Sequence, residues 1–100
     1  MQILDKLTGA EKKEKIEFML RLIDRLLADD DLFTDKILLM DTVEEMYFML
    51  RQLALGSKDE NLLNAFEKVA ILRYYLQNKD ALDREILKDV KNSLARVASR

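Results

Sequence analysis

The chain has 100 residues, enough for one domain with a modest core, and it contains no His, Cys, Pro or Trp. Without imidazole or thiol groups, it lacks the usual side chains of zinc binding, thiol catalysis and acid–base catalysis near neutral pH. Its 17 basic and 19 acidic residues give a net charge of −2 and no general attraction to nucleic acid. We therefore expect no cofactor, no metal site and no nucleic-acid partner.

Apolar residues make up 49% of the chain and charged residues 36%, which is typical of a folded globular protein. The longest uninterrupted apolar run, residues 46–50, is far too short to span a bilayer. Charged residues begin at Asp5 and Lys6, unlike the start of a secretory leader. Together with the absence of Cys, these features predict one domain over residues 1–100 in the cytoplasm.

The first predicted helix covers residues 9–28. Thr8 and Glu11 have the spacing of a capping box, in which the hydroxyl and the carboxylate each satisfy a backbone N–H group at the helix start. Residues 1–7 are expected to form at most a short extra turn, whose apolar side chains seek cover.

The second predicted helix covers residues 34–55 and follows an acidic link at residues 29–31. Carboxylates in such a link are potential ligands for Ca²⁺ or Mg²⁺, but the link lacks the spacing and the Gly of a calcium loop. We interpret them as solvated acids that cap the second helix. Asp41-Thr42-Val43-Glu44 is a weaker capping pattern and predicts a kink or restart inside this helix.

The third predicted helix covers residues 58–77. Gly56 suits the position just after a helix end, and Ser57 and Glu60 repeat the capping-box spacing. The fourth predicted helix covers residues 81–98, with Asp80 or Asn78 as its cap. Connections this short place neighbouring helices antiparallel.

Each predicted helix carries an apolar stripe at helical spacing. The stripes comprise Ile16, Met19, Leu20, Ile23, Leu26 and Leu27; Leu39, Val43, Met46, Tyr47, Leu50, Leu53 and Ala54; Leu62, Ala65, Phe66, Val69, Leu72 and Leu76; and Leu82, Ile86, Val90, Leu94 and Val97. Four inward stripes predict an all-α fold, an antiparallel up-down-up-down four-helix bundle. Arg73 and Asp89, at the edges of two stripes, predict an ion pair between them, or from Arg73 to another carboxylate.

Several large apolar side chains fall off these stripes, more than a bundle of four helices has room to bury. They indicate a contact surface, most simply for a homodimer. The alternatives are that residues 1–7 fold back over them or that the helices cross irregularly. The candidate surface consists of Phe18, Ile37, Phe48, Leu55, Tyr74 and Tyr75.

Glu14 and Glu17 resemble the Glu-x-x-Glu pair of all-helical nucleoside triphosphate pyrophosphohydrolases. The resemblance implies Mg²⁺ held between helices with the help of a second acidic pair, for which Asp41/Glu44 and Asp80/Asp83 are the candidates. Glu14 and Glu17 lie away from the apolar stripe, however, and both second pairs are also placed as helix caps. A Mg²⁺-dependent enzyme is therefore the second alternative to a protein without catalytic residues.

The second half of the chain resembles the small cytosolic immunity proteins that protect bacteria from their own bacteriocins. The resemblance lies in Leu62-Leu63-Asn64, Tyr74-Tyr75, Asn78-Lys79 and the opening of the last helix, Leu82-Asp83-Arg84-Glu85. It implies a four-helix antiparallel bundle and an inhibitor that acts through protein contacts. From the residues themselves, we predict a non-catalytic cytosolic interaction protein, a regulator or adaptor that is homodimeric, with an immunity-type inhibitor as the first alternative.

Overall fold

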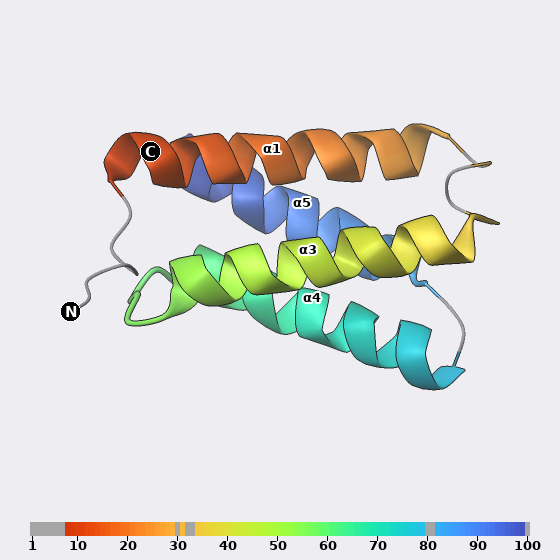
Figure 1. The fold of residues 1–100 in the computed structure, drawn as a ribbon. Coiled ribbons are helices and arrows are strands. Elements are labelled where there is room, and N and C mark those ends of the chain that lie inside the picture. Colours follow the sequence, from red (N-terminus) through yellow and green to blue (C-terminus); the bar gives the residue numbers. More distant parts are fainter. Residues whose placement is uncertain (1–7, 30, 32–33, 80–81, 100) are drawn as a thin grey trace.

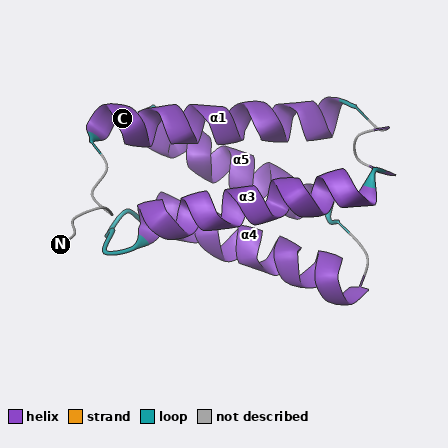
Figure 2. Cartoon of the chain, viewed as in Figure 1, coloured by secondary structure: helices purple, strands orange, loops and turns teal. Residues whose placement is uncertain are grey.

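The computed structural model describes residues 8–29, 31, 34–79 and 82–99, so the turn predicted in residues 1–7 lies outside the described residues. Four helices run through the described part: α1 (Gly9–Ala28), α3 (Lys36–Ala54), α4 (Glu60–Lys79) and α5 (Arg84–Ala98) (Figure 1). Within that part, every regular element is a helix, and a short loop joins α3 to α4 (Figure 2). The predicted all-α antiparallel four-helix bundle is confirmed.

The start of α1 is the predicted capping box. The Thr8 hydroxyl accepts a hydrogen bond from the Glu11 N–H at 3.0 Å, and the Glu11 carboxylate accepts one from the Thr8 N–H at 2.9 Å. The hydrogen bond with the Thr8 backbone lowers the pKa of Glu11 below its usual value, and the hydrogen bond with the Thr8 side chain lowers it further. The bounds of α1 are those predicted from the sequence.

The other three helices begin two or three residues later than predicted, each after an Asp that serves as its cap. The carboxylate of Asp35 accepts a hydrogen bond from the Leu38 N–H at 3.1 Å, that of Asp59 from Asn61 at 2.9 Å, and that of Asp83 from Glu85 at 2.8 Å. Where several polar residues precede a helix, a carboxylate is favoured as the cap because the positive end of the helix dipole also stabilises its negative charge.

The predicted caps Ser57 and Asn78 are therefore wrong. Ser57 lies in the loop before α4, where its hydroxyl accepts a hydrogen bond from the Asp59 N–H at 3.1 Å. Asn78 lies inside α4, and its amide donates to the Tyr74 carbonyl at 3.0 Å. Asp80, the other candidate, lies outside the described residues.

Within the acidic link, Asp29 and Asp31 do not cap α3, because the nearby Asp35 has that role, and Asp30 lies outside the described residues. Asp29 instead ends α1, and its carboxylate accepts a hydrogen bond from the Asp31 N–H at 2.9 Å. The kink predicted at residues 41–44 is wrong as well. Helix α3 continues through them with Thr42 and Val43 buried, because no Pro or Gly interrupts its hydrogen bonds.

The helices form a ring in chain order. Among the described residues, α1 packs on α3 and α5, and α4 packs on α3 and α5, while helices at opposite corners make no contact. The predicted stripes of the first three helices supply most of the core. The stripe predicted for the last helix also packs on the core, with Leu82, Ile86 and Val97 half-buried, but it omits Leu87 and Ser93, which are fully buried. Leu87 lies within about 60° of Val90 around the helix, inside the broad stripe that a bundle helix buries.

Polar contacts tie α5 to both neighbours. Lys91 forms an ion pair with Asp24 of α1 at 2.7 Å, and the Asn64 amide of α4 donates to the buried Ser93 hydroxyl at 2.7 Å. Asp89 pairs with Lys68 of α4 at 3.6 Å, so the prediction that it pairs with Arg73 is wrong.

Candidate interaction surface

Large apolar side chains are exposed on one half of the bundle. Ile37, Phe48 and Leu55 are 75%, 53% and 69% exposed, and they come from α3 and the residue that caps its end. The other exposed large hydrophobic residues in the described part of the chain, Leu63, Ile71 and Tyr74, come from α4. The described parts of α1 and α5 expose none, so the surplus predicted from the sequence is confined to two adjacent helices.

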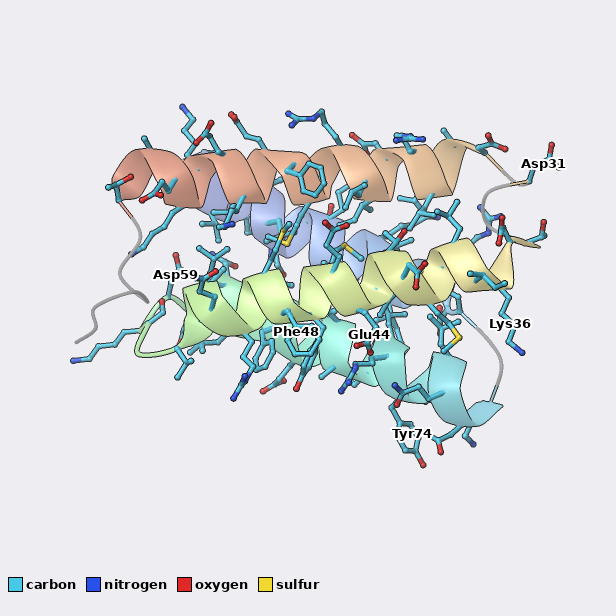
Figure 3. All side chains as sticks on the ribbon, in the orientation of Figure 1. Asp31, Lys36, Glu44, Phe48, Asp59 and Tyr74 are labelled. Atoms are coloured by element: carbon cyan, nitrogen blue, oxygen red, sulfur yellow. The ribbon has the colours of Figure 1, made fainter. Side chains whose placement is uncertain are left out.

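The three residues of α3 lie on one line along its outer side. Ile37 and Phe48 are eleven residues apart and Phe48 and Leu55 seven, which returns the helix to within about 20° of the same direction each time. Figure 3 shows Phe48 on the side of α3 that borders α4, and Tyr74 projecting outward from α4. We call Ile37, Phe48, Leu55, Leu63 and Tyr74 the α3–α4 face.

Leu55 stands between two shallow hollows on this face. One, of about 270 Å³, lies against Phe48, Arg51, Gln52 and Leu55. The other, of about 330 Å³, lies where the end of α3 meets Leu63 and Phe66 of α4, and it also borders Arg51 and Leu55. Helix surfaces pack when side chains of one insert into hollows of the other, and this face has both a projecting Leu and open hollows.

An aromatic cluster packs beneath the exposed side chains of the face. The Tyr47 ring packs edge-on against Phe48 at 5.3 Å between centroids, and against Phe66 of α4 at 5.4 Å. The Arg73 guanidinium lies over the Tyr47 ring, 4.4 Å from its centroid. These contacts hold Phe48 by packing across the seam between α3 and α4.

Glu44 is the carboxylate that pairs with Arg73, as one of the two sequence-based alternatives expected. The hydrogen bond from the Arg73 Nε to Glu44 raises the pKa of the guanidinium above its ordinary value. The guanidinium is therefore charged at every accessible pH, held between Glu44 and the face of Tyr47. Glu44 and Phe48 lie side by side on α3 (Figure 3).

Two of the six predicted surface residues lie elsewhere. Phe18 is half-buried in a groove between α1 and α3, away from α4. Tyr75 is half-buried on the side of α4 that turns toward α5, although its ring lies 6.2 Å from that of Tyr74. Ile37, Phe48, Leu55 and Tyr74 remain exposed on α3 and α4.

The face also contains features that sequence reasoning missed. The predicted surface includes neither Leu63 nor Arg51, which borders both hollows. Phe66, assigned to the inner stripe, is half-buried at the seam. Leu55 and Leu63 are separated by the loop between α3 and α4. Helical periodicity, which applies within one helix, therefore does not predict that these two side chains lie close together.

The carboxylates do not gather into a ligand set. No group of three or more His, Cys, Asp or Glu side chains within the described ranges is placed to hold a metal ion. Glu14 lines the groove between α1 and α3, whereas Glu17 is exposed outside it. The Asp41/Glu44 pair is divided, since Glu44 binds Arg73 while Asp41 is exposed.

None of the helices, over the residues described, combines the length and the apolarity needed to cross a membrane. In comparisons with known proteins, no family model matches the chain, and no curated protein or solved structure shows significant similarity to it.

Proposed function

We propose that this protein is a non-catalytic, cytoplasmic interaction module that forms a homodimer through the α3–α4 face. The observation that carries the proposal is that, among the described residues, the exposed large apolar side chains all come from α3, the residue that caps its end, and α4. Single exposed apolar residues are normal on any protein, but here three lie in one line along α3, and three more, Leu63, Ile71 and Tyr74, lie on the helix that packs beside it.

The chemistry of the face supports self-association. Phe48 and Leu55 supply apolar anchors, each contributing on the order of 1.5–3 kcal/mol if fully buried. Arg51 and Gln52 provide a polar border, as interfaces have around an apolar centre. The same patch carries a projecting side chain and open hollows, which is what a two-fold interface requires because each surface meets its own copy.

An immunity-type inhibitor is the second candidate function. Leu63 and Tyr74, which belong to the segments that resemble bacteriocin immunity proteins, both lie on the α3–α4 face. In that case the face binds another protein in place of a second copy. The proposal differs from the first in one measurable respect, since the isolated protein is then a monomer.

The experiment compares two double variants of equal charge. Phe48→Glu/Leu55→Glu places carboxylates in the centre of the face, and Ala28→Glu/Ala95→Glu places them on exposed positions of α1 and α5. Analytical ultracentrifugation up to about 100 μM protein, a range that detects weak dimers, gives the mass of each. We expect dimers for the natural sequence and the control, and a monomer with unchanged helical circular dichroism for the face variant.

A monomeric natural protein over this whole range would overturn the homodimer. A dimer that survives in the face variant would move the interface away from α3 and α4. In the first case, the inhibitor remains to be tested by binding to an added protein partner.

A further inference from the structure

We propose that the seam between α1 and α3 is a second binding site, which takes a basic amphipathic helix of a protein partner. A groove of about 390 Å³, open to solvent, runs along this seam. Its lining consists of Glu11, Glu14, Lys15 and Phe18 of α1 with Glu45 and Met49 of α3. The groove lies away from the α3–α4 face, so the inference is independent of the proposed function.

The groove exists because α1 packs more extensively on α5 than on α3. Phe18 is therefore covered only in part, and Met49 opposite it is half-buried. One turn further along, a smaller hollow of about 50 Å³ lies between Leu22 of α1 and Leu38 and Thr42 of α3. The apolar floor thus continues along both helices.

The length of this floor fits a helix. From Glu11 to Arg25, which lines the far hollow, the seam spans about 21 Å, the length of about 14 helical residues. Two neighbouring helices with an open seam present the surface on which a third helix lays its apolar stripe. Met49 adds a flexible side chain, which adapts to the shape of an occupant.

The charge of the groove selects a basic occupant. Three carboxylates, Glu11, Glu14 and Glu45, line the larger hollow against the single ammonium group of Lys15, while the far hollow adds only the guanidinium of Arg25. Glu14 and Glu45 are exposed and form no ion pair with any residue that the structure describes. Lys or Arg side chains flanking an apolar stripe would meet these carboxylates, whereas an acidic helix would be repelled.

The probe is a synthetic helical peptide of about 14 residues, with leucines at the spacing of one helix face and lysines beside them. A second peptide has glutamate in place of each lysine. Fluorescence anisotropy measures the affinity of the full chain for both, and amide chemical shifts locate the site. We expect the lysine peptide to bind at least about tenfold more tightly than the glutamate peptide, with shifts around Phe18 and Met49.

Two charge-reversal variants test the groove itself. Glu14→Lys/Glu45→Lys changes its mouth, while Glu17→Lys/Glu67→Lys makes the same change of net charge at exposed positions elsewhere. We expect the first to weaken binding of the lysine peptide by more than about tenfold and the second by less than about threefold, as long-range charge effects are screened by salt.

Equal weakening by both variants would overturn the proposal, because attraction would then reflect net charge alone. Absence of binding by the natural chain would also overturn it. Binding that occurs only after residues 1–7 are removed would assign the groove to the chain's own leading segment and not to a partner. The Phe48→Glu/Leu55→Glu variant keeps its affinity for the peptide if the two surfaces are separate, whatever the outcome for dimerisation.

Discussion

Gly56 shows how one residue shapes the candidate surface. Its φ of +75° lies in the left-handed region, which a side chain disfavours, and it directly follows the end of α3. The reversal that it permits leaves Leu55 exposed at the helix end and brings the chain round to Leu63 of α4. The backbone conformation of Gly56 thus determines where Leu55 and Leu63 lie on the α3–α4 face.

Substituting Gly56→Ala is expected to cost about 1 kcal/mol of stability through the backbone alone. A Cβ at this position would meet no atom within 4 Å, so no steric clash contributes. Gly9→Ala is the matched control, because Gly9 is helical with equally open surroundings, and it should be neutral or slightly stabilising. Urea unfolding of the two variants checks this, and equal stabilities would contradict the role given to the φ of Gly56.

At the scale of the helices, the start of α1 was the most predictable feature and the placement of surface residues the least. The capping box depends only on Thr8, Glu11 and the spacing between them, so it can be recognised from the sequence alone. Periodicity likewise placed Ile37, Phe48 and Leu55 on one line of α3. It gives the direction of a residue relative to its own stripe, but not which helix lies beside it. The predicted surface therefore includes Phe18 of α1, which lies in the groove between α1 and α3, away from α4.

The capping box predicts a stability that depends on pH. Folding lowers the pKa of Glu11 from its ordinary value of 4.5, so the carboxylate contributes stability that is fully present above that value and lost as the pH falls through the lower folded value. Glu11→Gln should therefore lower the melting temperature near neutral pH and match the natural chain in acid. Thermal unfolding between about pH 3 and pH 7 tests it. A difference that stays constant across this range would show that the charge of Glu11 is irrelevant.

At the scale of the whole molecule, the four helices leave two unlike surfaces on either side of α3. Toward α4, the face is apolar and supported by aromatic rings, while toward α1 the seam is an open groove with an acidic mouth. The ring order of the helices followed from their short connections. The uneven packing of α1 does not follow from the sequence. It depends on how the side chains of three helices fit together, and the apolar stripe of one helix does not give this information.

The arrangement of carboxylates also predicts the response to metals. Since the described residues bring no three of them together, Mg²⁺, Mn²⁺ and Ca²⁺ at about 1 mM should shift the melting temperature by less than about 1 °C. A pyrophosphohydrolase-like enzyme predicts a clear rise with Mg²⁺, because binding to the folded state stabilises it. Thermal unfolding with and without each ion, against a potassium control of equal ionic strength, separates the two.

The unequal contacts of α1 have a consequence for synthesis on the ribosome. Of the four described helices, α1 is made before the others and has its main neighbour in α5, which is made after them. While the chain grows, α3 and α4 can join as a hairpin before α5 is made. Closure of the ring must therefore wait until α5 has emerged from the ribosome.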